Sequence, residues 1–157
     1  MSVKAIPEGF HSITPYLVCN GAEKAVEFYQ HAFNAQLVLR LDMPDGRIAH
    51  AEIKIGDSHI MLTNEHPEMG FVSPETLGGA GVSLMLYGDD CDAMFAQAIS
   101  AGATELRPLT DQFYGDRTAT VKDPFGHVWT IGTHKEDLTQ QQLEQRMAEF
   151  MSNFQQH

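Results

Sequence analysis

The sequence has few cysteines, few basic side chains and no long run of apolar residues. Its two cysteines, Cys19 and Cys91, cannot form a disulfide scaffold, and their spacing to other metal ligands fits no zinc motif. We interpret both as small buried side chains in a reducing cytoplasm. The 10 basic residues are outnumbered by 21 acidic ones, and the net charge of -11 repels phosphate backbones and anionic lipid surfaces. The composition therefore predicts that neither nucleic acid nor a membrane is a partner.

The lack of apolar runs also bears on where the protein resides. No stretch approaches the roughly 20 apolar residues that cross a bilayer, and the opening MSVKAIPEGFHS has no apolar segment before a cleavage site. We therefore predict a cytoplasmic location. With 157 residues, of which 43% are hydrophobic and 20% charged, the chain has the size and composition of one globular domain.

The first half of the chain alternates between strand and helix patterns. A β-branched, apolar run ends in the turn signal Asn20-Gly21, and apolar residues then recur at helical spacing. Further apolar runs are separated by the turn signals Pro44-Asp45-Gly46 and Gly56-Asp57. These patterns predict a strand over 11–20, a helix over 22–33, and strands over 36–41, 48–55 and 58–63.

The second half repeats this order after a segment rich in glycine and proline. Residues 64–81 hold two prolines and four glycines without periodicity, so we interpret them as a linker. After it we predict a strand over 81–87, a helix over 91–101, a strand over 104–109 and a hairpin of strands 118–122 and 127–133. The repeated order indicates an α+β fold built by duplication of a unit of roughly 50 residues.

The last segment, 139–154, has the pattern of an amphipathic helix. Thr139 and Gln142 form a capping-box signature at its start. One face carries the apolar residues Leu143, Met147, Phe150, Met151 and Phe154. This face needs a partner surface, which is either the protein's own sheet, covered by the helix as a lid, or a second copy of the chain.

Strand parity separates core side chains from those that face a cavity in the first half. If Gly56-Asp57 is a two-residue hairpin loop, Ile53 pairs with Ile60, and the aliphatic residues share one face. The opposite face then carries His50, Glu52 and Lys54 across from His59 and Met61. Ionisable groups on one side of a hairpin are costly when dry, so this face is predicted to be wet or to bind a ligand.

The second half gives a milder cavity face. Asp123-Pro124-Phe125-Gly126 suits a type I turn with a glycine bulge, and this register pairs core residues Val121 with Trp129. The cavity side is then lined by Thr118, Thr120, Val128 and Thr130. The preceding segment, 112–117, combines two aromatic residues with a potential Asp116/Arg117 pair. It suits either a small-molecule site or a turn that packs its own aromatics.

These landmarks resemble the vicinal oxygen chelate superfamily, specifically its glyoxalase/bleomycin resistance protein/dioxygenase-like family. The resemblance rests on ITPYLVCNGAEKAVEFYQHAFNA, HAEIKIGDSHIMLTNE, DDCDAMFAQAISAGA and FYGDRTATVKDPFGHVWTIGTH, which cover most of residues 8–135. It implies paired βαβββ modules that form an incomplete β-barrel around a small-molecule site, usually within a homodimer. The implied organisation is one domain over 1–137, with module one at 9–65, a linker at 66–80 and module two at 81–135, followed by an amphipathic helix within 138–157.

The resemblance also implies where metal-dependent members place their ligands. Those positions correspond in this chain to Thr14, Met61, Ser83 and Thr130, and none of these is a good ligand for a divalent cation. We therefore expect no cofactor at the usual position. The alternative is a divalent metal at a displaced site built from His50, Glu52 and His59. The histidines at strand ends, His11 and His134, are expected to be exposed.

The first functional interpretation is a metal-independent small-molecule-binding protein, similar in architecture to antibiotic-sequestering resistance proteins. Its predicted pocket residues are Thr14, Tyr16, His50, Glu52, Met61, Ser83, Met85, Tyr114, Thr120 and Thr130. The alternative is a lyase, isomerase or dioxygenase that uses Glu52 as general base with His50 orienting it, or both as displaced metal ligands. A third alternative is a partner-binding adaptor, which only the C-terminal helix supports. The expected partners are a small-molecule ligand and a second copy of the chain.

Overall fold

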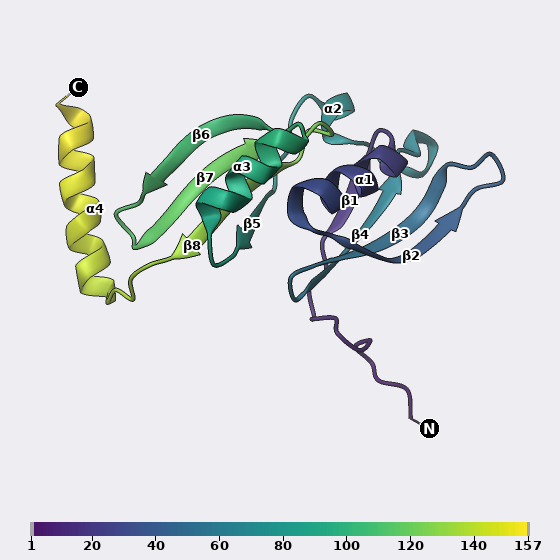
Figure 1. The fold of residues 1–157 in the computed structure, drawn as a ribbon, viewed down its shortest axis with the longest axis horizontal. Helices are drawn as coiled ribbons and strands as arrows, with labels where there is room; N and C mark the ends of the chain where they lie inside the picture. Colours follow the sequence, from purple (N-terminus) through teal and green to yellow (C-terminus); the bar gives the residue numbers. More distant parts are fainter. Residues whose placement is uncertain (1, 157) are drawn as a thin grey trace.

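The computed structural model describes residues 2–156 and contains the same run of elements twice, followed by a helix (Figure 1). The first run comprises β1 (Tyr16–Cys19), α1 (Ala22–Phe33), β2 (Gln36–Asp42), β3 (Ile48–Ile55) and β4 (Ser58–Asn64). The second comprises β5 (Ser83–Tyr87), α3 (Cys91–Ala101), β6 (Thr104–Asp111), β7 (Asp116–Lys122) and β8 (Val128–His134). Between them lie a short 3-10 helix, η1 (Pro67–Met69), and a short helix, α2 (Pro74–Leu77). The last element is α4 (Gln140–Gln155).

The two runs form two four-stranded sheets with equivalent strand orders. The first sheet has the order β1-β4-β3-β2, and the second has the order β5-β8-β7-β6. In each sheet the first strand of the module pairs in parallel with the last one, β1 with β4 and β5 with β8. The other strand pairs are antiparallel. This arrangement confirms the predicted α+β fold of two βαβββ modules with a C-terminal helix.

The first strand is shorter than predicted. It begins at Tyr16 rather than at His11, so Thr14 lies before the sheet. Pro15 explains the limit, because a proline has no N–H to donate to the ladder and restricts the residue before it. Its carbonyl still accepts a hydrogen bond from the Met61 amide at 2.9 Å, which starts the pairing with β4. The predicted helices over 22–33 and 91–101 are confirmed without a shift.

The β3–β4 hairpin has the predicted register. Ile55 pairs with Ser58, Ile53 with Ile60 and Ala51 with Leu62, on either side of Gly56, whose φ of 57° suits a glycine. The four aliphatic residues of this hairpin that were predicted to face the core, Ile53, Ile55, Ile60 and Leu62, are at most 4% exposed. A shift by one residue would have reversed both faces, so the turn determines which side chains lie on the open face of the sheet.

The β7–β8 hairpin also has the predicted register. Val121 pairs with Trp129 and Ala119 with Ile131, and all four side chains are buried. The turn closes with a hydrogen bond from the Gly126 amide to the Asp123 carbonyl, and Gly126 has a φ of 90°. Thr120 and Thr130 consequently share the other face of the sheet.

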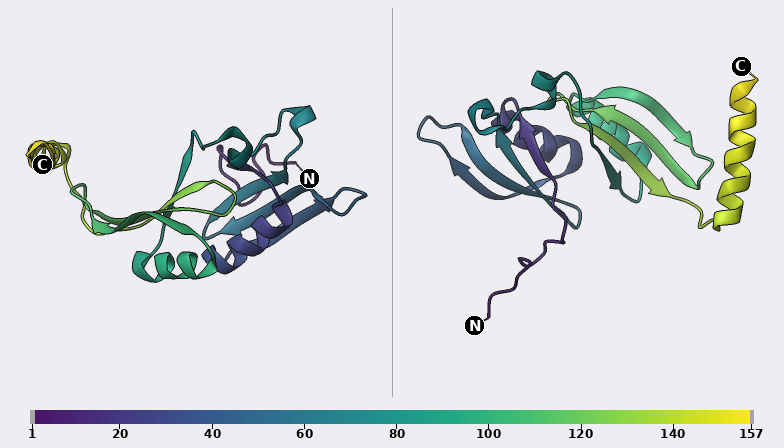
Figure 2. Two further views of the ribbon diagram at one scale, coloured as in Figure 1. Left: turned by 90° about the horizontal axis from the view of Figure 1, so that it is seen from above. Right: turned by 180° about the vertical axis from the view of Figure 1, so that it is seen from behind.

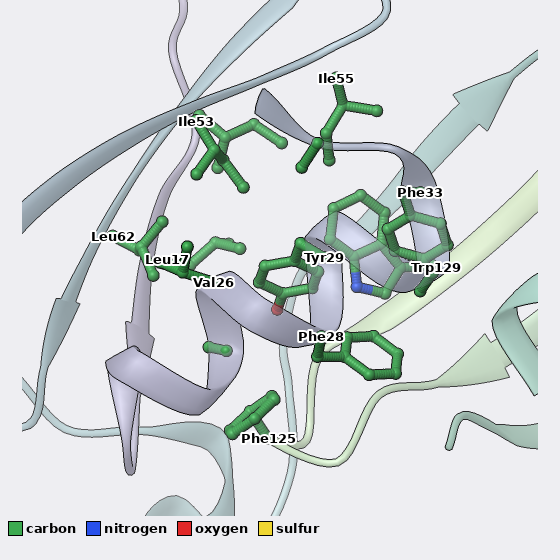
Figure 3. Packing of buried hydrophobic residues seen from close by; sticks show 14 of the residues in the cluster. Leu17, Val26, Phe28, Tyr29, Phe33, Ile53, Ile55, Leu62, Phe125 and Trp129 are labelled. Atoms are coloured by element: carbon green, nitrogen blue, oxygen red, sulfur yellow. The ribbon is translucent and has the colours of Figure 1, made fainter. Parts of the chain in front are cut away.

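The hydrophobic core joins the two modules. Figure 2 shows α1 and α3 side by side on one side of the two sheets, where they pack against each other. Tyr29 and Phe33 of α1 contact Trp129 of β8 with ring centroids 5.5 and 4.7 Å apart, and Phe28 meets Phe125 at 6.2 Å (Figure 3). The modules are therefore held together within one chain by aromatic packing between their helices and turns.

A buried carboxylate reinforces this junction. Asp123 is 3% exposed, and its Oδ2 accepts hydrogen bonds from the Tyr29 hydroxyl at 2.5 Å and from Trp129 Nε1 at 2.9 Å. Its Oδ1 accepts from the amides of Phe125 at 2.9 Å and His127 at 3.0 Å. Burial, and secondarily the Asp123 charge, raise the pKa of the Tyr29 phenol. The phenol thus remains a donor to the carboxylate.

The sheets themselves are not joined. Among residues 2–156, hydrogen-bonded strand pairing occurs within each module and not between β1 and β5. Both sheets turn the face opposite α1 and α3 to the same side of the molecule, where the linker crosses (Figure 2). The barrel is therefore open within one chain.

The C-terminal helix does not cover its own sheet. It stands beyond the far end of the second module in every view (Figures 1 and 2), and its apolar residues remain largely exposed, with Phe154 at 71%. The predicted capping box is present at Thr139 and Gln142. Arg146 anchors the helix by pairing with Glu136 at 2.9 Å and donating to the Phe113 carbonyl. The interpretation as a lid over its own sheet is therefore wrong, because this anchor holds the helix at the edge of the module.

Candidate functional site

The open face of module one is the face of the first sheet opposite α1. Strand pairing places Tyr16, Leu39, Leu41, His50, Glu52 and Met61 near its centre, with Lys54 and His59 further along the same face. Met61 stands between Tyr16 and Glu52, since it pairs with both across neighbouring strands. Leu39 and Leu41 flank the polar groups from β2 and are 40% and 53% exposed. The arrangement is a mostly apolar surface with a small polar centre, which is typical of small-molecule sites.

A chain of hydrogen bonds forms the polar centre. The Tyr16 hydroxyl lies 2.9 Å from Nδ1 of His50, and Nε2 of His50 lies 3.3 Å from Oε1 of Glu52. The three groups therefore form a continuous path across the first sheet. The side chains of His50 and Glu52 are 24% and 17% exposed, so both are largely shielded from solvent.

The linker covers one side of Tyr16. Phe71 stacks on the tyrosine ring with centroids 6.1 Å apart and an interplanar angle of 28°. Partial burial raises the pKa of the Tyr16 phenol above its usual value, since the charged phenolate is less well solvated there. The phenol is therefore neutral and able to donate its proton to His50.

The open face of module two is chemically milder. It carries Ser83, Met85 and Tyr87 from β5 together with Thr120 and Thr130 from the neighbouring strands. The hydroxyls of Thr120 and Thr130 lie 3.1 Å apart and hydrogen-bond to each other. Met85, which pairs with Thr130, is 43% exposed.

A second polar cluster on this face was missed by reasoning from the sequence. Oδ2 of Asp116 accepts a hydrogen bond from the Tyr87 hydroxyl at 2.8 Å, and its Oδ1 lies 2.6 Å from Nδ1 of His134. The second ring nitrogen of His134 is 2.8 Å from Asp137. The expected Asp116/Arg117 pair is absent from these contacts, because adjacent strand residues point to opposite faces, and Arg117 instead pairs with Asp92 at 2.7 Å.

This cluster makes a specific pH prediction. The hydrogen bonds to Asp116 and then to Asp137 raise the pKa of His134. A raised pKa in the folded state stabilises the protein below the unfolded histidine's value of about 6.5, and the contribution is lost as the pH rises through the folded pKa. We expect His134→Gln to lower the free energy of unfolding at about pH 5.5 and to have little effect at about pH 9. Urea unfolding at both pH values measures this difference.

The control for this measurement is His31→Gln. His31 is an exposed histidine on α1 whose Nδ1 contacts the Glu27 carbonyl rather than a carboxylate. This control should show no comparable dependence on pH. Equal losses of stability for His134→Gln at acidic and alkaline pH would contradict the assigned role of the Asp116 and Asp137 contacts.

Besides an open hollow between α1 and α3, two cavities lie between the modules on the side of β1 and β5. One, of about 410 Å³, is lined by the linker and by Tyr16, Val18 and Leu84. The other, of about 250 Å³, is lined by Thr14, His59, Met85 and Trp129, among others. The buried Nδ1 of His59 has no hydrogen-bond partner within the described chain. The junction thus collects three of the predicted pocket residues: Thr14, Tyr16 and Met85.

Apart from Thr14 and Tyr114, the predicted pocket residues divide between the two open faces. The structure brings Tyr16, His50, Glu52 and Met61 together on module one. Ser83, Met85, Thr120 and Thr130 lie on module two. Tyr114 lies in the β6–β7 turn, where it contacts Phe113 beside α4. This turn packs its own aromatics, as one of the two sequence interpretations proposed.

The positions that hold metal in metal-dependent relatives do not fit a divalent cation here. Thr14, Met61, Ser83 and Thr130 supply hydroxyls and a thioether, and the Thr130 hydroxyl is already engaged by Thr120. At the displaced site, Nδ1 of His50 is engaged by Tyr16. Across residues 2–156 there is no group of three or more His, Cys, Asp or Glu side chains that could hold a metal ion.

The duplicated βαβββ modules with open sheet faces are the architecture that the sequence resemblance implied, and a family comparison agrees with it. The sequence profile of the Glyoxalase/Bleomycin resistance protein/Dioxygenase superfamily matches residues 9–131. The chain belongs to this superfamily. No helix within the described residues has both the length and the apolar character that spanning a membrane requires.

Individual relatives and structures agree with this assignment. The uncharacterized protein Mb0911c of Mycobacterium bovis is 36% identical over 140 residues, covering 87% of this chain and 92% of the relative. TioX from Micromonospora sp. ML1 superimposes with a TM-score of 0.62 at 25% identity, over 82% of this chain and 100% of that chain. The fosfomycin resistance protein FosX from Listeria monocytogenes has a TM-score of 0.62 at 13% identity, over 85% and 97% of the two chains, and shares the fold alone.

Proposed function

We propose that this protein binds a small organic molecule, without a divalent metal, at the open faces of its two modules. The observation that carries the proposal is the chain of hydrogen bonds Tyr16–His50–Glu52, which lies among the exposed side chains of Leu39 and Leu41 and the half-buried Met61. Three linked polar groups on an otherwise apolar sheet face give orientation and specificity, while the apolar surroundings supply affinity.

A second copy of the chain is part of this proposal. Each open face lacks an opposite wall within the described residues, because the two sheets lie beside each other rather than face to face. Met85 and Tyr87 on module two, like Leu41 on module one, are at least 43% exposed. A two-fold related copy would bury both sets and close a cavity between them. We propose a cytoplasmic homodimer whose ligand sites are each completed by its partner.

A ligand screen tests the binding function. We expect planar aromatic antibiotics or related organic molecules to raise the thermal unfolding temperature, and divalent cations to leave it unchanged. The ligand should also shift the methyl NMR signals of Met61 and Met85, while Met69, in the exposed η1 turn, is the control. Stoichiometric zinc, nickel, manganese or iron that survives dialysis would contradict a metal-independent site.

Removal of the C-terminal helix tests the dimer. α4 contributes no buried residue to its own chain, so deleting residues 139–157 should leave the cores of both modules folded. We expect the deletion to shift the sedimenting species from dimer to monomer at micromolar concentration, because the exposed apolar face of α4 is buried by the partner. Circular dichroism of the truncated protein checks that the modules remain folded.

A matched pair of full-length variants tests whether association depends on the apolar face of α4 or only on the presence of the helix. Phe150→Gln combined with Phe154→Gln removes two exposed aromatic rings that stack on each other at 6.4 Å. Gln141→Ala changes an exposed residue in the first turn of the same helix. Only the double variant should weaken association, and sedimentation of the intact protein as a monomer would reject the dimer outright.

An enzyme of the same superfamily is the second candidate function. The 3.3 Å contact between His50 and Glu52 favours it, because a histidine held by a carboxylate is a common element of acid–base catalysis. The sequence predicted for this alternative that Glu52 is the general base and that His50 orients it. The other ring nitrogen of His50, Nδ1, lies 2.9 Å from the Tyr16 hydroxyl. We therefore infer that a ligand meets Tyr16, rather than Glu52, at the end of this chain of hydrogen bonds.

A further inference from the structure

We propose that Tyr16, His50 and Glu52 form a proton relay in which the Tyr16 phenol exchanges a proton with a bound, enolisable carbonyl compound. This inference rests on the proposed binding of a small molecule at the open face of module one. It adds the chemical class of that molecule and the residue that touches it. Tyr16 is the catalytic residue, whereas His50 and Glu52 are positioning residues that act through it.

The direction of the hydrogen bonds follows from the chemistry of the three groups. A carboxylate only accepts, so Nε2 of His50 donates to Oε1 of Glu52 across 3.3 Å. In a neutral imidazole the other nitrogen then lacks a proton, so Nδ1 accepts from the Tyr16 hydroxyl at 2.9 Å. The two hydrogen bonds therefore run in one direction, from the Tyr16 phenol as donor to the Glu52 carboxylate as final acceptor.

Exposure distinguishes the end that a ligand reaches. Tyr16 is 44% exposed, while the side chains of His50 and Glu52 are 24% and 17% exposed. Met61 lies between Tyr16 and Glu52, and the leucines of β2 border the other side. A ligand on this face therefore meets the phenol oxygen first, and the apolar border lowers the local dielectric and strengthens the hydrogen bonds behind it.

The relay supports a balanced proton transfer. As the ligand's α-carbon gives its proton to the Tyr16 oxygen, the phenol proton passes to Nδ1 of His50, and the C–H bonding pair becomes the enolate of the ligand. His50 becomes an imidazolium that is held by the Glu52 carboxylate through Nε2. Return of a proton to the same or a neighbouring ligand atom restores all three groups, so the step requires no oxidant, reductant or second substrate.

Partial burial of Tyr16 fits this order of events. Desolvation raises the pKa of the phenol, so Tyr16 is a poor resting base and keeps its own proton until the ligand supplies another. Because the net acceptor of the proton is the His50 imidazole, the step requires a ligand whose α-proton is already acidified by neighbouring carbonyl groups. An enol or a 1,3-dicarbonyl compound has this acidity without the help of a metal ion, which the face does not provide.

The first test is the tautomer of His50. Long-range 15N–1H correlation spectra of the unliganded protein should show a proton on Nε2 and none on Nδ1. Glu52→Gln should alter this signature, because a carboxamide can donate to the ring as well as accept. Loss of the signals in His50→Gln identifies them, and His31→Gln, on the exposed side of α1, is the control that leaves the relay untouched. A proton on Nδ1 in the wild-type protein would overturn the relay even if a ligand binds.

The second test measures proton exchange on a defined probe. We expect the wild-type protein to accelerate deuterium incorporation at C3 of 2,4-pentanedione at least tenfold over Tyr16→Phe and His50→Gln, with the His31→Gln control at the wild-type rate. Wild-type exchange no faster than in buffer, at probe concentrations that shift the Met61 methyl signal, would overturn the relay alone. If no organic molecule in the ligand screen shifts Met61, the proposed binding function fails as well.

Discussion

Replacing Asp123 with alanine should destabilise the protein by about 4 kcal/mol. The side chain is buried at the junction of the modules and accepts four hydrogen bonds, two from side chains and two from backbone amides. Alanine leaves the Tyr29 hydroxyl, Trp129 Nε1 and both amides without an acceptor in a dry environment. Urea unfolding followed by the fluorescence of Trp129, the one tryptophan in the chain, measures the loss.

A more conservative variant separates the two halves of the Asp123 network. Asp123→Asn keeps an oxygen for the two turn amides but turns an NH2 group toward the Tyr29 hydroxyl and Trp129 Nε1, which are both donors. We expect it to cost roughly half as much as alanine. Asp42→Ala, which removes an exposed pair with Arg40, is the matched control and should change stability by at most about 1 kcal/mol. A loss below about 1 kcal/mol for Asp123→Ala would contradict the assigned network.

Asn64→Ala should destabilise the first module by about 3 kcal/mol. The N-cap of helix α1 is Gly21, which has no side chain to cap the helix, and the missing acceptor comes instead from the end of β4. Oδ1 of Asn64 accepts from the amides of Gly21 at 3.1 Å and Ala22 at 2.7 Å, while Nδ2 donates to Glu23 and to the Ile48 carbonyl. Alanine leaves these groups buried and unpaired.

The pH dependence of this variant checks the mechanism. Burial raises the pKa of Glu23, but the hydrogen bonds from the Ile48 amide and the Asn64 side chain outweigh it, and the net effect is a lowered pKa. A lowered pKa stabilises the fold above the carboxyl's unfolded value of about 4.3, and the contribution is lost as the pH falls through the folded pKa. The difference in the free energy of unfolding between wild type and Asn64→Ala should therefore become smaller at acidic pH. Asn153→Ala on the exposed side of α4 is the control, with an expected change within about 0.5 kcal/mol.

Local patterns were sufficient to predict the two long helices of the modules and the faces of the strands, but not the short helices η1 and α2, which lie in the segment predicted to be a linker. The apolar spacing over 22–33 and 91–101 matched α1 and α3, because each helix places a single apolar stripe against its sheet. The turns at Gly56-Asp57 and at 123–126 determined the registers of both hairpins, since turn length leaves one pairing that buries the aliphatic residues. His50 and Glu52 could therefore be placed on the open face from the sequence.

Strand ends were predicted less well, since they depend on partners that are distant in the chain. The first strand was predicted over 11–20 but begins at Tyr16, where β4 becomes available for pairing. The sixth was predicted to end at 109 but extends to Asp111, because β7 starts at Asp116 and offers it a longer partner. Apolar content within a segment carries no information about the length of the neighbouring strand.

The amino-acid sequence by itself determined the two βαβββ modules, the registers of their hairpins and the polar residues of the open face, because each of these follows from periodicity and turn chemistry within one module. Only the tertiary structure decided which groups meet across modules and strands. It joined Tyr29 to Asp123, Tyr16 to His50 and Tyr87 to Asp116, pairs that are 94, 34 and 29 residues apart in the chain. It also placed α4 at the edge of module two, because Glu136 and Phe113 hold Arg146 there. Side-chain contacts of this kind depend on how the folded elements pack, and no local pattern contains that information.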